Sequence, residues 1–195
     1  MILLVCYWTA YFSIHSLLSM RRLKKKVSDL RPGFPYRLAY NILATILLFP
    51  GAWLLWGHPW TVLWTFQGFW KYLAYFMQFL AFSGFLFSLK YYDMKAFIGL
   101  MPDEGSFAIS PFHRHVRHPW YALALVMIWF SDMNSGRLAT AIMVTIYFFL
   151  GSKHEESMLI ERFGKSYASY RVRVPGLIPL PWKYLTKEEA ESLVK

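Results

Sequence analysis

The chain has 195 residues, of which 56% are hydrophobic, 20% aromatic and only 16% charged, and its mean hydropathy is +0.31. Average soluble domains carry roughly 25% charged residues, so this composition excludes an ordinary soluble domain and indicates an integral membrane protein. The net charge of +10 does not predict nucleic-acid binding, because the basic residues stand between apolar runs; membrane lipid is the expected partner.

Five apolar stretches follow one another, and each is predicted to be a transmembrane helix. They are residues 1–20, 38–56, 71–89, about 118–132 and about 136–152. The strictly apolar parts of the last two are shorter than the roughly 20 residues of a full span. Either they extend into their polar flanks and form a helical hairpin, which we prefer, or the hairpin enters the membrane part-way. The predicted fold class is all-α integral membrane, in one domain covering residues 1–195.

Basic residues predict the topology. A run of arginine and lysine at 21–26 follows the first span, and such runs are held on the cytoplasmic side. We therefore expect the N-terminus outside and the C-terminus in the cytoplasm. No basic residue precedes the first apolar stretch, which favours a retained helix over a cleaved signal peptide.

The segments between and after the spans are also interpretable. Pro50 is expected to bend the second span. Residues 91–112 predict a short interfacial helix followed by a loop containing Pro102 and Gly105. Residues 153–182 form the predicted cytoplasmic segment: an amphipathic helix that continues to Tyr170, then a proline-rich apolar strap at 174–182. Residues 186–195 predict a short polar tail.

Two polar clusters flank the hairpin, at residues 113–121 and 153–156. If both arms are helical, the second cluster returns to the level of the first. Glu155 and Glu156 point about 100° apart on a helix, so one carboxylate can face inward and bind an ammonium group. Arg117 can bind a carboxylate, and the rings of Trp120 and Tyr121 suit a sulfonium or an adenine. S-adenosylmethionine combines all of these groups.

Other interpretations of the clusters are weaker. The histidines at 113, 115, 118 and 154 could bind zinc, but their spacing follows no regular metal motif, and we predict no metal site. Serine- and cysteine-nucleophile motifs and a dinucleotide-binding G-x-G-x-x-G are absent from the sequence. The structural alternatives are lipid-headgroup contact for the basic cluster and a solvated helix end for the acidic pair.

The C-terminal half carries these motifs in a particular order. They are Arg-His-Pro-Trp-Tyr at 117–121, the pair Glu155-Glu156, Phe163-Gly164, Tyr167, Tyr170 and Val-Pro-Gly-Leu-Ile-Pro at 174–179. Their order and spacing over residues 110–182 resemble the integral-membrane methyltransferases of the isoprenylcysteine carboxyl methyltransferase superfamily. The upstream residues are most similar to the bacterial methanethiol S-methyltransferase branch, which implies the bacterial inner membrane as the location.

The resemblance implies a pocket for S-adenosylmethionine, closed toward the cytosol and open sideways to lipid. Carried over residue by residue, the implied cofactor-binding set is Arg117, His118, Pro119, Tyr121, Glu155, Glu156 and Tyr167. Some relatives have an arginine just before the acidic pair, where this chain has Lys153 and His154. The implied catalytic set is Arg117, Lys153 and Glu156, with positive potential favouring a thiolate acceptor. His118 or His154 is a minor candidate for the base.

Three functions are therefore compared. The leading hypothesis is an S-adenosylmethionine-dependent methyltransferase that acts within the membrane on a small or lipophilic thiol, the acceptor being lipophilic or volatile. A second keeps the cofactor and changes the acceptor to a prenylcysteine carboxylate or a lipid. A third is a non-catalytic, nurim-like membrane protein. The sequence leaves the oligomeric state open.

Overall fold

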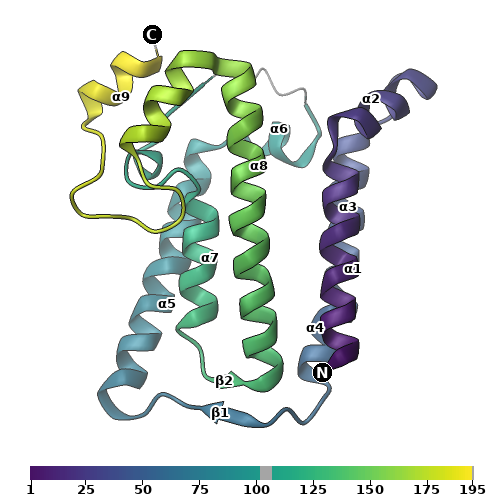
Figure 1. The fold of residues 1–195 in the computed structure, drawn as a ribbon, viewed down its shortest axis with the longest axis vertical. Helices are drawn as coiled ribbons and strands as arrows, with labels where there is room; N and C mark the ends of the chain where they lie inside the picture. The colour runs from purple at the N-terminus through teal and green to yellow at the C-terminus, as the bar shows by residue number, and fades with distance from the viewer. Residues whose placement is uncertain (102–106, 195) are drawn as a thin grey trace. The chain divides into compact units, whose positions relative to one another are not determined.

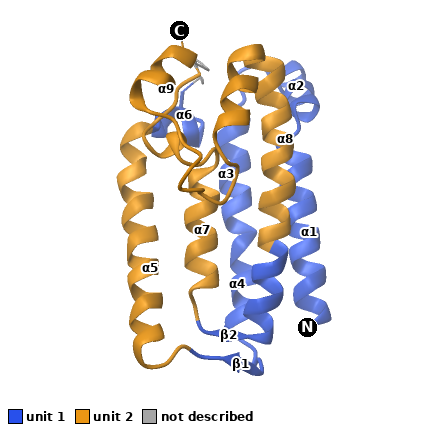
Figure 2. Ribbon diagram, turned by 60° about the vertical axis from the view of Figure 1, so that its left-hand side comes forward, with its two compact units in different colours: residues 1–65, 92–104, 132–143 blue, residues 66–91, 105–131, 144–195 orange. Residues whose placement is uncertain are grey.

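The computed structural model describes residues 1–101 and 107–194 and is mostly helical. It divides into two compact units, which Figure 2 distinguishes by colour. Unit 1 comprises residues 1–65, 92–104 and 132–143, and unit 2 comprises residues 66–91, 105–131 and 144–195. The loop predicted around Pro102 and Gly105 lies outside the described residues.

Unit 1 is built from the first helices of the chain. They are α1 (Ile2–Ser19), α2 (Arg21–Leu30), α3 (Tyr36–Ile46), α4 (Leu48–Trp56) and the short α6 (Met94–Ile98). Its core is a cluster on α1 formed by Leu4, Trp8 and Tyr11. Gly51 of α4 is needed beside it, because a Cβ there would lie 2.7 Å from the Trp8 ring. The predicted short helix after the third span is α6, which Asp93 caps by accepting from the backbone N–H groups of Lys95 and Ala96.

The second predicted span is interrupted, as expected from Pro50, but the interruption lies at Leu47. A proline inside a helix supplies no N–H, and its ring crowds the carbonyl four residues earlier. That carbonyl belongs to Ile46, the last residue of α3. The position of the break thus follows from the proline.

Unit 1 also contains a small antiparallel sheet that the all-α prediction did not include. Strand β1 (Val62–Trp64) pairs with β2 (Met133–Asn134), with Val62 opposite Asn134. Gly136 next to β2 approaches the Trp60 ring so closely that a Cβ would lie 2.6 Å away. Three- and two-residue strands are too short to give an alternating pattern, so the sequence carried no recognisable signal.

Unit 2 contains the later helices. They are α5 (Gly68–Ser88), the 3-10 turns η1 (Leu89–Tyr91) and η2 (Phe112–Arg114), α7 (Pro119–Trp129), most of α8 (Ser135–Arg173) and α9 (Lys187–Val194). α5 and α7 lie side by side (Figure 1). The Trp120 indole donates to Ser88 Oγ at 2.8 Å. The Leu123 side chain packs against the backbone of Gly84, which has no side chain in the way.

Four helical stretches are long and apolar enough to cross a membrane within the described residues: 2–19, 36–56, 68–91 and 135–173. They indicate a multi-pass membrane protein. The fourth predicted span corresponds to α7, which has 11 residues. At about 1.5 Å per residue, this helix is about 16 Å long, roughly half of a hydrocarbon core.

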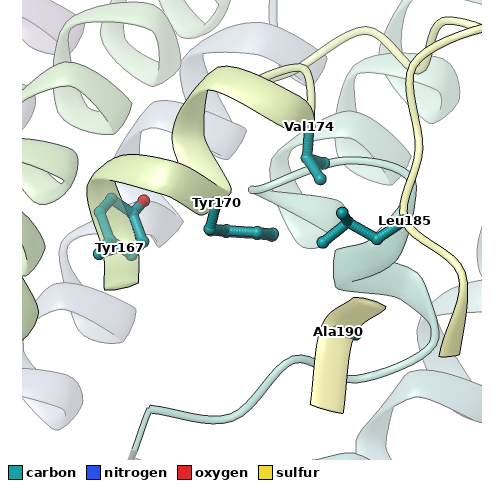
Figure 3. Packing of buried hydrophobic residues seen from close by; sticks show 5 residues of the cluster. All are labelled: Tyr167, Tyr170, Val174, Leu185 and Ala190. Carbon is teal, nitrogen blue, oxygen red and sulfur yellow. The ribbon is translucent and has the colours of Figure 1, made fainter. Parts of the chain in front are cut away.

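The C-terminal part of unit 2 has a core of its own (Figure 3). Tyr167, Tyr170 and Val174 pack with Leu185 and with Ala190 of α9. The predicted strap is non-helical, as expected. The predicted polar tail instead contains α9, whose first turn is closed by reciprocal bonds: Thr186 N–H donates to the Glu189 carboxylate, and Glu189 N–H donates to Thr186 Oγ1.

Candidate functional site

A buried ion pair joins the two polar clusters of the sequence. Arg117 Nε and Nη2 donate to the same carboxylate oxygen, Oε1 of Glu156, at 2.9 and 2.6 Å. The side chains are only 8% and 2% exposed. Charges buried to this extent are tolerated when they are paired and hydrogen-bonded. The predicted meeting of Arg117 and Glu156 is therefore present in the structure.

The backbone of the strap fixes the arginine. Arg117 N–H donates to the Pro175 carbonyl at 2.8 Å, and His118 N–H donates to the Gly176 carbonyl at 3.1 Å. The Arg117 guanidinium also donates through Nη1 to the carbonyls of Arg171 and Val174. The end of α8 and the start of the strap thus each supply an acceptor that a charged guanidinium needs once it is removed from water.

The second oxygen of Glu156 has a different environment. Oε2 is buried and lies 3.0 Å from Arg171 Nε, an ion pair in which Oε2 accepts no hydrogen bond. Burial would raise the pKa of Glu156, yet hydrogen bonds from His118 and Arg117 and their positive charges outweigh it and lower the pKa to about 2. Glu156 is thus a carboxylate at neutral pH with acceptor capacity remaining on Oε2.

His118 lies between the two carboxylates of the acidic pair. Its Nε2 is 3.2 Å from Glu156 Oε1, and its Nδ1 is 3.4 Å from Oε2 of the half-exposed Glu155. His118 occupies the N-cap position of α7, and Pro119 lies in its first turn. The imidazole makes no capping hydrogen bond, because it is directed to the carboxylates instead.

Three aromatic rings stack beside this cluster. The His118 and Tyr121 rings have centroids 5.5 Å apart, and the Tyr121 and Phe148 rings 4.5 Å apart, each pair within 9° of parallel. Offset-parallel stacking at these distances is favourable. Phe148 belongs to α8, so the stack also connects α7 with α8.

The structure does not bring all predicted residues into the ion-pair cluster. Lys153 is exposed, and its Nζ lies 5.5 Å from the centre of the Phe149 ring. Tyr167 is buried in the C-terminal core, with its ring 5.8 Å from that of Phe107. Burial raises the pKa of Tyr167, which keeps its hydroxyl protonated.

Arg171, Phe148 and Gly176 complete the cluster but were not singled out in the sequence. Arg171 follows Gly164, whose φ of 57° and ψ of −128° interrupt the helical geometry of α8. No helical repeat across that interruption could align Arg171 with Glu156. Gly176 was recognised only as part of the strap; a Cβ there would lie 3.3 Å from Arg117 Nη2.

Unit 2 also contains an apolar cavity of about 700 Å³. The α7 residues Ala122, Leu123 and Val126 line it, and the strap contributes Leu177, Ile178 and Pro179. The strap therefore borders both features: Gly176 faces the ion pair, and the three residues after it face the cavity. Within the described residues, no group of three or more His, Cys, Asp or Glu side chains is arranged to hold a metal ion.

Comparison with known proteins identifies relatives of part of this chain. A methanethiol S-methyltransferase of Pseudomonas deceptionensis is 38% identical over 79 residues, which are 40% of this chain and 30% of that protein. Methanethiol S-methyltransferase 1 of Bradyrhizobium diazoefficiens is 43% identical over 68 residues, 34% of this chain and 24% of that protein. The chain is a distant homologue of the methanethiol S-methyltransferases.

This homology confirms the resemblance seen in the sequence, since these enzymes belong to the membrane methyltransferase group related to isoprenylcysteine carboxyl methyltransferase. A third homologue, the methanethiol S-methyltransferase of Crocosphaera subtropica, is 32% identical over 90 residues, 46% of this chain and 33% of that protein. The matches with these three homologues thus span a third or less of their lengths. No family model and no solved structure matches the chain.

Proposed function

We propose that the protein is an S-adenosylmethionine-dependent methyltransferase embedded in the membrane and that it methylates a thiol. The observation that carries this proposal is the buried Arg117–Glu156 pair, held by the strap beside stacked rings. The partial homology to methanethiol S-methyltransferases supports the same activity.

The chemistry of the cluster fits the proposed methyl donor. Glu156 Oε2 is a buried carboxylate oxygen with acceptor capacity, which suits an ammonium group. Arg171 is half-exposed and suits a carboxylate, and the Tyr121 and Phe148 rings suit a sulfonium or an adenine. When bound, S-adenosylmethionine supplies a methyl group that a thiolate sulfur takes up, while the electron pair of the broken carbon–sulfur bond stays on the donor sulfur.

Each residue of the proposed cofactor set has a distinct task. Glu156 orients Arg117, and Glu155 and His118 form the polar edge of the site. Pro119 starts α7 so that Tyr121 stacks beside His118, and Tyr167 anchors the C-terminal core behind the cluster. We propose this set, with Arg117, His118, Pro119, Tyr121, Glu155, Glu156 and Tyr167, as the donor site.

The catalytic contribution of the chain is positioning and electrostatics. Methyl transfer requires the reacting atoms to be held in line and away from water, which a site with buried side chains provides. We propose that the positive charge of Arg117, which Glu156 keeps in place, favours the thiolate form of the acceptor. Lys153 would add to this positive potential from its exposed position outside the ion-pair cluster. The proton of the acceptor thiol is released to solvent or is taken up by His118, which then acts as the base.

The proposed membrane arrangement follows the sequence. Five spans, with α7 and the first part of α8 as a hairpin, place the N-terminus outside and the C-terminus in the cytoplasm of a bacterial inner membrane. Residues 1–195 then act as one membrane domain, and residues 153–182 close the donor site from the cytoplasmic side.

Binding of the methyl donor tests the enzyme hypothesis. The purified full-length protein is titrated with S-adenosylmethionine by calorimetry, alongside Glu156→Gln and the exposed control Glu161→Gln on the same helix. We expect saturable binding that Glu156→Gln weakens by at least about tenfold and Glu161→Gln leaves unchanged. Absence of binding to the parent protein would instead favour the non-catalytic, nurim-like alternative.

Product analysis tests the acceptor class. The protein is incubated with methyl-labelled donor and a panel containing a thiol, a prenylcysteine and a phospholipid. We expect label in a methyl thioether, which for methanethiol is the volatile dimethyl sulfide. Label in a methyl ester or in a lipid would support the second alternative, in which the same donor site serves a different acceptor.

A further inference from the structure

We infer that helix α2 lies on the membrane surface and binds the headgroups of anionic phospholipids. The inference goes beyond the proposed function: it concerns residues of unit 1 alone and holds whether or not the protein transfers methyl groups. It depends on three observations, which are the place of α2 between two spans, the separation of its apolar and basic side chains, and its unpaired positive charge.

Connectivity brings α2 to the membrane boundary. α1 ends at Ser19, and the next helical stretch that is long and apolar enough to cross a membrane begins at Tyr36. The Tyr36 hydroxyl donates to the Leu18 carbonyl at 2.7 Å, so the end of one stretch lies beside the start of the other. The segment between them, which contains α2, therefore lies where the hydrocarbon ends.

α2 is a separate helix and not an extension of α1. Met20 between them is extended, with φ −63° and ψ 132°, and α2 leaves the end of α1 sideways (Figure 1). An isolated helix of ten residues is marginal in water, and the arginines at positions 21 and 22 oppose the helix dipole at its start. None of the ten described residues of α2 is buried, so contact with a surface outside the protein best accounts for the helix.

The side chains of α2 separate into two faces. Leu23, Val27 and Leu30 recur at spacings of four and three residues and therefore lie on one side of the helix. Leu30 is 72% exposed, and Phe34 shortly after the helix is 42% exposed. Contact with hydrocarbon removes this apolar surface from water, as in other amphipathic helices that lie in a membrane interface.

The remaining sides of α2 are strongly basic. Five of its ten residues are arginine or lysine, and Asp29 is its single acidic residue. In the described part of the chain, no carboxylate pairs with Arg22, Lys24, Lys25 or Lys26. Long basic side chains can extend from an apolar boundary to the level of the lipid phosphates, so anionic headgroups supply the missing counter-charges.

Membrane topology alone does not require this arrangement. A basic loop sets the orientation of a membrane protein through its charge, and a run without regular structure would serve equally well. A helix with an apolar side adds contacts that only a surface with both hydrocarbon and negative charge satisfies. Nucleic acid supplies the negative charge, but it would leave Leu30 and Phe34 in water.

The test measures whether the apolar side of α2 enters an anionic bilayer. In a Cys6→Ser background, Leu30→Cys carries a polarity-sensitive fluorophore. The full-length protein is placed in nanodiscs of phosphatidylcholine with increasing fractions of phosphatidylglycerol. Ser28→Cys is the matched control, because its side chain lies two residues, or about 200°, around the helix from residue 30.

We expect phosphatidylglycerol to move the emission of the Leu30→Cys label to shorter wavelengths and to leave that of the Ser28→Cys label unchanged. The insertion equilibrium obtained from this shift should fall at least about tenfold when three lysines of α2 become glutamine: Lys24→Gln, Lys25→Gln and Lys26→Gln. Removal of three exposed lysines elsewhere should leave it unchanged: Lys165→Gln, Lys183→Gln and Lys187→Gln.

Salt provides a second arm of the test that needs no lysine substitution. Because the Debye length shrinks from about 10 Å at about 0.1 M salt to about 3 Å at about 1 M, the emission shift should decrease as salt rises. The same shift in pure phosphatidylcholine, or no shift in either bilayer, overturns the inference. Binding of an RNA oligonucleotide that the lysine-to-glutamine variant of α2 loses, without any lipid-dependent shift, would assign the basic side to nucleic acid and also overturn it.

Discussion

Arg117 and Glu156 show how a polar pair far apart in sequence becomes a single unit. Both charges lose their hydration on burial, which costs several kcal/mol per ion and is offset only by good geometry and further hydrogen bonds. Here the Val174 carbonyl of the strap, the Arg171 carbonyl and His118 supply those hydrogen bonds. The net contribution of the pair to stability is therefore small, whereas removal of one partner is costly.

The first prediction concerns this asymmetry. Glu156→Ala leaves the buried guanidinium of Arg117 without a counter-charge and should lower the free energy of unfolding by about 3–5 kcal/mol. Thermal unfolding of the detergent-solubilised protein measures it, with the exposed Glu161→Ala as the control. If the double variant Glu156→Ala/Arg117→Ala were no more stable than Glu156→Ala, the penalty would not come from an unpaired arginine.

The second prediction concerns His113, whose Nδ1 lies 2.7 Å from Ser110 Oγ. Burial lowers the pKa of His113 from its ordinary 6.5 to about 4; the nearby His118 charge adds to this and Glu155 opposes it. Between these pH values the unfolded chain takes up a proton that the folded protein does not. Stability contributed by neutral His113 is therefore complete above pH 6.5 and lost as the pH falls to 4.

Melting temperatures at pH 6.5 and pH 4 check this effect. His113→Gln should show a smaller loss between the two than the parent protein, because glutamine does not titrate, while the exposed control His154→Gln should keep the parental loss. If the melting temperature of His113→Gln fell as much as that of the parent protein, the acid sensitivity would come from other groups.

At the scale of single residues, the sequence predicted some members of the ion-pair cluster and missed others. Arg117 and Glu156 were predicted to lie at one level because a helical hairpin returns the second polar cluster to the first; their direct pairing was not predicted. Arg171 was not predicted, because a long helix with an internal glycine break gives no simple repeat. Lys153 was chosen by resemblance, and its place over Phe149 depends on a side-chain rotamer that the sequence does not specify.

At the scale of elements, α8 provides a comparison between two of its glycines. Gly164 has φ 57° and ψ −128°, a conformation that residues with a Cβ adopt only with strain, and its surroundings are open. Gly151 is helical, and its surroundings are also open. The two glycines thus have equally open surroundings and differ only in backbone conformation.

The third prediction uses this difference. Gly164→Ala should destabilise the protein by about 1–3 kcal/mol because of backbone strain alone. Gly151→Ala should stabilise it by about 0.5–1 kcal/mol, since alanine loses less freedom in a helix. Unfolding free energies of both variants in the same detergent provide the measurement. Equal effects of the two substitutions would show that Gly164 is not held in its unusual conformation.

Element boundaries were predictable where a residue type imposes them. Pro50 predicted a bend in the second span, which the structure shows as the break between α3 and α4. The sheet of β1 and β2 was not predictable, because its pairing joins short segments about 70 residues apart and depends on tertiary structure. Helix α9 was predictable from Thr186 and Glu189, because a threonine followed three residues later by a glutamate often begins a helix through such reciprocal hydrogen bonds. The short polar segment was instead interpreted as a tail.

At the scale of the whole molecule, the path of the last two apolar segments decides on which side of the membrane their connection lies. α7 has 11 residues, whereas α8 continues well past its apolar part. Two full spans place the connection around residue 132 outside the cell. A hairpin that enters part-way leaves that connection within the membrane. Both paths leave the C-terminus on the cytoplasmic side that the basic loop predicts, so only the connection distinguishes them.

The fourth prediction concerns this connection. In a Cys6→Ser background, single cysteines are introduced at the exposed positions Thr65, Asp132 and Ser192, and intact cells are treated with a membrane-impermeant maleimide. Basic residues 21–26 are expected to hold the first loop in the cytoplasm. Five spans therefore predict labelling of Thr65→Cys and Asp132→Cys from outside and of Ser192→Cys only after permeabilisation. Labelling of Thr65→Cys without Asp132→Cys would instead mean that the hairpin does not reach the outer surface, although Arg117 and Glu156 would still meet at its cytoplasmic end.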